Sequence, residues 1–179
     1  MVLKKAFLVL GILFVSVQLS AFQLSKSIKK KVDKELVKNF DGVQLSLEPV
    51  LIDASVNAKL SKQIGKYNLF AIQKENTRIG YAYVDKAPSK TDQFDYLILL
   101  DSNLIIMKAK VLLYREDYGG EIGSKRWLKQ FIGKSSQVPL KYRKDIIAIS
   151  GATISASSMT RAINAFLKNL IILKQENTL

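Results

Sequence analysis

The sequence predicts an α+β fold in which helices flank an antiparallel sheet, and three observations support this prediction. Segments with a two-residue hydrophobic period gather between residues 69 and 114, separated by short polar turns. Segments with a helical period lie before and after that region, and the longest of them is close to the C-terminus. Because the helices do not alternate with the strands, a parallel α/β sheet is not expected.

Two helices and one strand are predicted before this central region. Residues 24–38 carry an apolar side chain every four residues, which predicts an amphipathic helix that covers the core or lies on anionic lipid headgroups. The period then changes to two, which predicts a short strand from Gly42 to Pro49. Residues 54–64 are predicted to be helical. Three apolar side chains would share one face of that helix: Val56, Leu60 and Ile64.

A meander of four strands is predicted next. The strands contain residues 69–73, 79–83, 94–100 and 104–114, and turns at 75–78, 87–90 and 101–103 separate them. In the second strand, Ile79, Tyr81 and Tyr83 are expected to share one face, most simply as packing residues. The third strand is apolar throughout its second half, which predicts a central strand covered on both faces.

The last third of the chain is predicted to be helical at two places. A flexible turn at 119–123 precedes a short helix at 124–132, and a polar, basic segment at 134–145 follows. The long helix is expected from 153 to 173, and the tail after it looks disordered. One stripe of the long helix is apolar: Met159, Ile163, Phe166, Leu167 and Leu170.

Composition limits the chemistry that the chain can perform. The 179 residues are 48% hydrophobic and 24% charged, which is enough for a packed core and excludes a disordered chain. There is no cysteine and no histidine. Disulfides, thiolate nucleophiles, Cys/His zinc sites, iron–sulfur clusters and imidazole bases are therefore excluded. Redox or acyl-transfer chemistry requires a bound cofactor, or Ser, Thr, Lys, Tyr and carboxylate groups alone.

The net charge of +13 indicates anionic partners, which are a nucleic acid, a membrane surface or an acidic protein. Lysine supplies most of this charge, and only five residues are arginine. Surfaces that read bases or clamp phosphates favour the planar fork of arginine. We therefore expect no nucleic-acid function, and a solvated lysine surface is the simpler interpretation.

Residues 1–21 have the three parts of an export signal. Lys4 and Lys5 are positive, residues 6–15 are apolar, and Leu19-Ser20-Ala21 ends the segment with small residues. An uncleaved membrane anchor is the alternative, because Leu19 is a poor residue three places before a cleavage site. Residues 6–22 are at the short limit for spanning a bilayer. The six lysines within residues 26–38 favour the cytoplasmic side, but the n-region and the apolar run favour export. We predict an exported protein, periplasmic or anchored to the outer face of the cytoplasmic membrane.

The best candidate site is Ser150-Gly151-Ala152-Thr153, where the apolar run 146–149 meets the last helix. Ser150 is expected to cap the helix, and Gly151 and Ala152 allow a ligand to approach the backbone. The first-turn amides have no intrahelical partner and lie at the positive end of the helix dipole, which favours a phosphate. The Thr153 hydroxyl lies in the same field, which would support a phosphoester bond. An ordinary helix start built from small residues is the alternative.

The segment Ile149-Ser150-Gly151-Ala152-Thr153-Ile154-Ser155 resembles the FMN-attachment motif of the FMN-binding domain family. That family includes flavin-carrying components of the sodium-translocating NADH:quinone oxidoreductase and of the Rnf electron-transport complex. In it, a flavin transferase joins FMN through its phosphate to the threonine of a Ser/Thr-Gly-Ala-Thr motif. The resemblance covers roughly residues 68–172 and implies covalent FMN on Thr153. The other cofactor-binding residues that it implies are Ser150, Gly151, Ala152, Ser155, Glu121 and Gly123.

Two positions depart from the family pattern. The family usually has an aspartate three residues before the serine of the motif, and this chain has Ile147 there, with Asp145 two places earlier. The family's turn often reads Glu-Thr-Pro-Gly, whereas here it is Glu121-Ile122-Gly123. Attachment of FMN and binding of FMN without a covalent bond are both compatible with this sequence.

The resemblance divides the chain into four parts. Residues 1–21 are the signal or anchor, residues 22–66 the amphipathic helix and a connecting segment, residues 67–173 the FMN-binding domain, and residues 174–179 a tail. It implies an exported flavoprotein that relays electrons in a membrane-associated or periplasmic redox chain, with a flavin transferase and an unidentified donor and acceptor as partners. Such a carrier needs no catalytic residue of its own.

Two other functions stay open. The chain is a cofactor-free, lysine-rich secreted module that binds anionic lipid, polymer or an acidic protein through residues 26–38, or it is a flavin-dependent reductase with a small substrate of its own. No metal site is expected, because the aspartates lack the spacing of metal ligands. Trp127 and Phe131 would wall a flavin ring or belong to the core. Lys125 and Arg126 would stabilise an anionic reduced flavin or lie on the surface.

Overall fold

The computed structural model describes residues 24–40 and 44–179. The predicted signal or anchor at 1–21, and the first residues of the strand predicted from Gly42, lie outside the described residues. Within the part of the chain that is described, no helix is both long enough and apolar enough to cross a bilayer.

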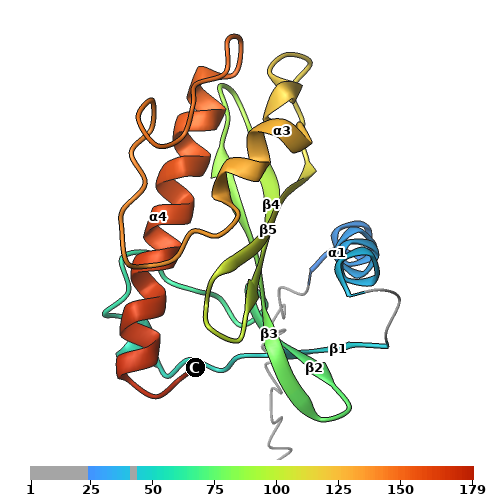
Figure 1. Ribbon diagram of the computed structural model, residues 1–179, viewed down its shortest axis with the longest axis vertical. Coiled ribbons are helices and arrows are strands. Elements are labelled where there is room, and N and C mark those ends of the chain that lie inside the picture. The colour runs from blue at the N-terminus through green and yellow to red at the C-terminus, as the bar shows by residue number, and fades with distance from the viewer. Residues whose placement is uncertain (1–23, 41–43) are drawn as a thin grey trace, which may run out of the picture.

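The centre of the fold is a five-stranded antiparallel sheet in which every strand pairs with its neighbour in the chain. The strands are β1 (Ser46–Pro49), β2 (Leu69–Lys74), β3 (Thr77–Pro88), β4 (Gln93–Asp101) and β5 (Ile106–Leu113). Helix α4 (Thr153–Gln175) covers one face, and helix α1 (Lys26–Asn39) lies on the other side of the sheet (Figure 1). This arrangement confirms the predicted α+β fold and the long C-terminal helix with the motif at its N-terminus.

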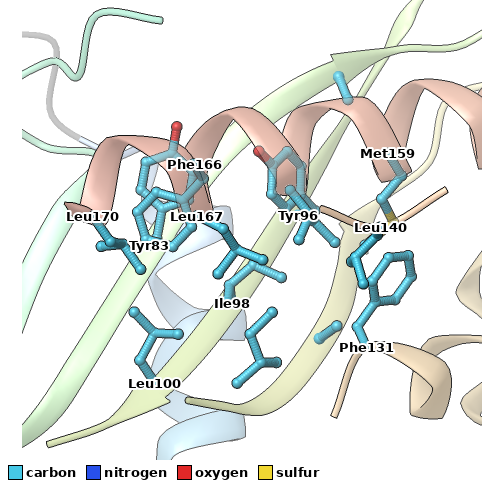
Figure 2. Packing of buried hydrophobic residues seen from close by; sticks show 14 of the residues in the cluster. Tyr83, Tyr96, Ile98, Leu100, Phe131, Leu140, Met159, Phe166, Leu167 and Leu170 are labelled. Carbon is cyan, nitrogen blue, oxygen red and sulfur yellow. The ribbon is translucent and has the colours of Figure 1, made fainter. Parts of the chain in front are cut away.

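The core has one hydrophobic layer on each face of the sheet. On one face, the predicted stripe of α4 packs against alternate side chains of β3 and β4 (Figure 2). Phe166 stacks on Tyr83 there, with ring centroids 3.8 Å apart. On the other face, Val32 of α1 belongs to the same cluster as Leu97 and Leu99 of β4. Successive residues of β4 therefore face opposite layers, which confirms the central strand that the apolar run predicts.

The hairpins differ from the predicted turns in detail. Glu75 and Asn76 alone form the turn between β2 and β3, with φ of 48° and 63°, the backbone that a tight two-residue hairpin needs. Strand β3 continues through Ala87 and Pro88, so the loop predicted at 87–90 begins two residues too early. Ile79 is the extra residue of a bulge and packs on the α1 side. The prediction that it shares a face with Tyr81 and Tyr83 is wrong.

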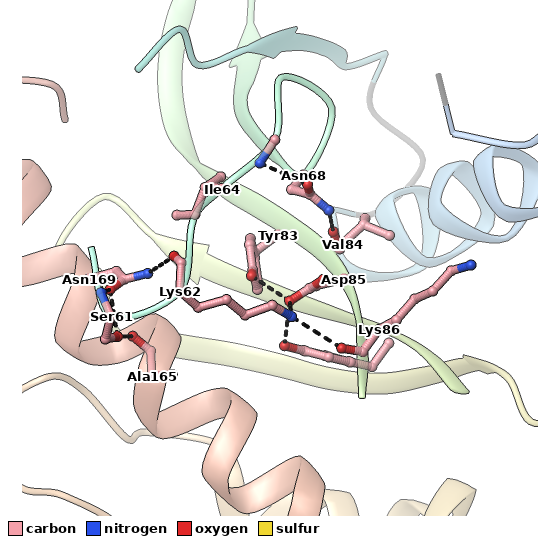
Figure 3. Close-up of polar contacts among 12 residues, drawn as sticks. Ser61, Lys62, Ile64, Asn68, Tyr83, Val84, Asp85, Lys86, Ala165 and Asn169 are labelled. Carbon is pink, nitrogen blue, oxygen red and sulfur yellow. Dashed lines mark hydrogen bonds and ion pairs between the residues drawn. The ribbon is translucent and has the colours of Figure 1, made fainter. Parts of the chain in front are cut away.

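The helix predicted over 54–64 is wrong beyond its first turn, since α2 spans only Ala54–Asn57. Asn57 turns the chain, because its side chain accepts a hydrogen bond from the Ile64 backbone N–H (2.9 Å) and donates one to the Ile64 carbonyl (3.0 Å). Asn169 of α4 accepts from the Ser61 N–H and donates to the Lys62 carbonyl (Figure 3). The three apolar residues predicted to share a face are nevertheless buried in one cluster.

The region between β5 and α4 contains only short helices. Helix α3 (Lys125–Leu128) lies between two 3₁₀ turns, Gly120–Gly123 and Lys129–Phe131. The α-helix is therefore shorter than the one predicted at 124–132, and the flexible turn predicted at 119–123 is mostly a 3₁₀ helix. The tail predicted to be disordered folds back at the end of α4. The Thr178 N–H donates to the Leu173 carbonyl (2.9 Å), and Leu179 packs against the core.

Candidate functional site

The motif forms a tight turn that leads directly into α4. Gly151 has φ of +80°, a left-handed backbone that favours glycine. The N-cap of α4 is Ala152, and no side chain caps the helix. The prediction that Ser150 caps α4 is wrong, because the turn at Gly151 places Ser150 two residues before the cap. The first-turn amides therefore have no side-chain acceptor, which leaves them available to an external anion.

A cleft of about 640 Å³ opens beside this turn, and we call it the motif cleft. Residues 151–155 form one wall, and residues 114–118 with Lys90 and Thr91 form the others. Thr153 is exposed in the cleft, so its hydroxyl is accessible to a ligand or to a modifying enzyme. The cleft lies within the size range of small-molecule sites in proteins, which is about 300–1,000 Å³.

Ser155 connects the two walls of the motif cleft. Its side chain is buried, and its Oγ lies 3.0 Å from the phenol oxygen of Tyr114, just after β5. This hydrogen bond joins the first turn of α4 to the end of the sheet. Tyr118 lies further along the same wall with 85% of its surface exposed, so its aromatic ring is accessible from the cleft.

Gly119 belongs to this site, although its role was not predicted from the sequence. It has φ of +84°, and a Cβ atom there would lie 2.8 Å from the Tyr114 phenol oxygen and 3.3 Å from the Gly151 carbonyl oxygen. A side chain at residue 119 would therefore crowd both Tyr114 and the motif turn, and its backbone angle favours glycine. The Gly119-Gly120 pair was the available signal, and it indicates a turn without indicating what packs against it.

Two charged side chains of the motif cleft, Arg115 and Glu116, are held by neighbouring groups. Arg115 donates to an Asp95 carboxylate oxygen (2.5 Å). Hydrogen bonds from the Ser89 side chain and from the Thr91 backbone N–H hold the pKa of the Glu116 carboxyl below its usual range. Glu116 therefore stays ionised and fastens the β3–β4 turn. Lys90 makes no ion pair among residues 24–40 and 44–179, which leaves its charge available to an anion at the motif.

The remaining predicted residues lie elsewhere. Ser150 and Glu121 line a second cleft of about 670 Å³, together with Arg126, Trp127 and Ile147. Gly123 lines neither cleft. The structure thus groups Gly151, Ala152, Thr153 and Ser155 at one cleft and separates them from the residues of the turn.

Position 147, where the family usually has aspartate, is fixed by its backbone. The Ile147 N–H donates to the Gln130 side chain (2.8 Å), and its carbonyl accepts from the Trp127 indole N–H (2.7 Å). The side chain itself is 69% exposed. Trp127 and Phe131 pack edge to face, with centroids 5.2 Å apart, and both are buried, which confirms their interpretation as core residues.

No group of three or more acidic side chains in residues 24–40 and 44–179 is arranged to hold a metal ion. Lys125 and Arg126 are both exposed, and neither lines the motif cleft. The site therefore offers amide donors, hydroxyls, one uncommitted lysine and an exposed aromatic ring, a set suited to an anionic aromatic ligand.

Residues 90–168 match the family model of the FMN-binding domain, the family that the motif resembles. The matched segment lies within the predicted domain at 67–173 and contains β4, β5, α3, the motif turn and most of α4. This match confirms the resemblance and supports FMN as the cofactor. No curated protein matches the chain.

Proposed function

The chain carries an FMN-binding domain, and on this premise we propose that it is an exported electron carrier whose FMN is bound through its phosphate to Thr153. The observation that carries the proposal is the position of Thr153, which is the first residue of an uncapped α4 and is exposed in the motif cleft. Family membership supports flavin binding. The covalent bond, the electron relay and the export are the parts proposed.

The residues of the motif cleft fit an FMN group. The first-turn amides of α4 would bind the phosphate, and the Lys90 ammonium would neutralise part of its charge. Tyr118 would contact the ring from the opposite wall. The cofactor supplies the redox chemistry, and the protein supplies attachment, orientation and control of the potential. A flavin transferase would join the phosphate to the Thr153 oxygen by breaking the phosphoanhydride bond of an activated FMN donor. The donor's other phosphate would be the leaving group, and the hydroxyl proton would pass to solvent.

A carrier agrees with the groups that this chain has. Histidine and cysteine are absent from the sequence, and Glu116 of the motif cleft accepts hydrogen bonds that hold the β3–β4 turn. The sequence therefore supplies no imidazole or thiolate for acid–base or nucleophilic chemistry on a second substrate. Electrons would therefore enter and leave through other redox proteins or a membrane donor. The export pattern of residues 1–21 supports a location outside the cytoplasmic membrane.

The attachment is tested by co-expressing the chain with a flavin transferase and examining in-gel flavin fluorescence after denaturation. The wild type is expected to fluoresce and Thr153→Ala to be dark. Thr91→Ala is the matched control, since Thr91 is a second threonine of the same cleft, and it is expected to retain the fluorescence. Fluorescence in Thr153→Ala would overturn the assignment. Both substitutions remove exposed hydroxyls, so each should change the free energy of unfolding by less than about 0.5 kcal/mol.

The relay is tested separately with the flavin-loaded protein. A carrier is expected to be reduced and reoxidised by small-molecule mediators without a second substrate. Steady-state consumption of a substrate with an artificial donor would instead favour a flavin-dependent reductase.

A further inference from the structure

We propose that a groove between α1, β5 and α3 binds an acidic, extended segment of a partner protein. The groove has a volume of about 290 Å³, and we call it the lysine groove. Five lysines line it, from α1, β5, α3 and the 3₁₀ turn that follows α3: Lys38, Lys108, Lys110, Lys125 and Lys129. They come from three separate stretches of the sequence, so the full charge cluster exists only in the folded chain.

The fold brings these lysines together through the alternation of β5. Ala109 and Val111 face the α4 layer of the core, which turns Lys108 and Lys110 toward the side of α1. Both lysines are half-buried, so their stems lie against the protein and their ammonium groups reach the groove. Lys38 reaches the groove from the last turn of α1.

The positive charge of the lysine groove is not compensated within the chain. Glu35, which is 8% exposed, is the one acidic residue lining it. In the described ranges 24–40 and 44–179, none of the five lysines takes part in an ion pair. Like charges gathered over one concave surface repel one another and create a positive potential that a bound anion relieves.

The shape of the groove favours a protein segment over a bilayer. The half-buried Lys108 and Lys110 lie at the strand that crosses the groove, whereas a planar lipid surface contacts side chains that project outward. Leu128 and Ile132 add apolar surface beside the charges, and Ile132 is 45% exposed. An extended segment with several carboxylates and an apolar side chain fits this combination. Lysine attracts carboxylates without fixed two-point geometry, which suits exchangeable complexes guided by charge.

The lysine groove is independent of the flavin proposal. It shares no lining residue with the motif cleft or with the second cleft. The helix that borders it, α1, lies on the side of the sheet away from α4 (Figure 1). Binding at the groove is therefore expected with or without FMN.

The test measures binding of a fluorescein-labelled decaglutamate peptide to the full chain by fluorescence anisotropy. The groove variant is Lys108→Gln/Lys110→Gln/Lys125→Gln/Lys129→Gln. The control variant, Lys74→Gln/Lys144→Gln/Lys168→Gln/Lys174→Gln, changes the net charge equally at exposed lysines outside the groove. We expect binding that weakens with salt, a dissociation constant about tenfold higher or more for the groove variant, and a change below about threefold for the control.

Three results would overturn the proposal. The first is equal weakening of peptide binding in both variants, which would show that net charge alone matters, and the second is no peptide binding by the wild type at low salt. The third is an affinity for phosphatidylglycerol vesicles that depends on the groove lysines and exceeds the affinity for the peptide. Lys125→Gln/Lys129→Gln changes only exposed side chains, so it gives a second test if the fourfold variant does not fold. It is expected to weaken peptide binding by about threefold or more.

Discussion

At the scale of single residues, Gly119 connects the backbone to the proposed site. Gly119→Ala introduces a Cβ atom 2.8 Å from the Tyr114 phenol oxygen at a φ of +84°. We expect a loss of about 1–2 kcal/mol in the free energy of unfolding, because a residue with a Cβ is strained at this φ. We also expect less flavin attachment, because Tyr114, which hydrogen-bonds Ser155, must shift. Gly120→Ala is the control, since its Cβ would meet nothing within 4 Å. Equal denaturation midpoints for the two variants would contradict this account.

Ile147 tests the departure from the family pattern. Its side chain is 69% exposed while its backbone is fixed by Trp127 and Gln130, so Ile147→Asp should change stability by less than about 0.5 kcal/mol. We expect this variant to be modified by the transferase faster than the wild type, and the measurement is the time course of flavin incorporation. Ile147→Asn has nearly the same shape without the charge. Equal acceleration by aspartate and asparagine would show that the carboxylate itself is not what the transferase needs.

At the scale of elements, the loop after α2 is held against α4 by hydrogen bonds to Asn169. Asn169→Ala removes hydrogen bonds to the Ser61 N–H and the Lys62 carbonyl from a residue that is 1% exposed. We expect a loss of about 2–3 kcal/mol, because buried polar groups lose their partners. Urea denaturation measures it, with Lys168→Ala, at an exposed position of the same helix, as the control. Similar stability of both variants would refute the anchoring role.

The sequence predicted elements well where one period extends over many residues. The stripe of α4 and the apolar run of β4 are such cases, and both are confirmed. The prediction failed where a turn or a bulge interrupts the hydrophobic period. Val56, Leu60 and Ile64 have helical spacing, but Asn57 closes a loop between them. Ile79 changes face because a bulge inserts one residue, and the bulge depends on pairing with β2.

The candidate site could be predicted from the sequence only where its residues are contiguous. The motif residues 151–155 are contiguous, and one local turn brings them to a single cleft. The other wall of the cleft comes from residues 114–118, which follow the sheet and carry no motif. Contacts between segments distant in sequence, such as Gly119 with Gly151, depend on the packing of the whole domain and are not encoded in local spacing.

At the scale of the whole molecule, the buried pair Tyr83 and Tyr96 makes the free energy of unfolding depend on pH in the alkaline range. The Tyr83 hydroxyl donates to Asp85 (2.7 Å), and Lys62 also pairs with Asp85 (Figure 3). Burial, followed by the nearby charges and hydrogen bonds, raises the pKa of Tyr83 and of Tyr96 well above the ordinary value of 10.0. The folded state therefore keeps protons that the unfolded state releases, so this stability is complete below pH 10 and decreases as the pH rises further.

We expect the free energy of unfolding to decrease above about pH 10 by up to about 1.4 kcal/mol per pH unit for each of the two tyrosines. The measurement is urea denaturation at a series of pH values. Tyr83→Phe/Tyr96→Phe is expected to be less stable at pH 8 and to have a shallower dependence above pH 10. The lysines titrate in both proteins, so the difference between the two curves isolates the tyrosines. Parallel curves would contradict the role of the pair.

The molecule places its two proposed functions on different parts of the fold. The proposed FMN-attachment motif begins α4 on one face of the sheet, and the lysine groove lies beside α1 and the edge strand β5. The sheet between them is buried on both faces and provides a rigid support. A flavin at the motif and an acidic partner at the groove would therefore be bound at the same time.

The central claim is that Thr153 carries FMN, and it is tested most directly by the intact mass of the denatured chain after co-expression with a flavin transferase in an exporting host. The predicted result is an increment of one FMN, located by fragmentation on the peptide that contains Thr153 and absent from Thr153→Ala. An unmodified mass from a colourless protein, or an increment on another residue, would contradict the account.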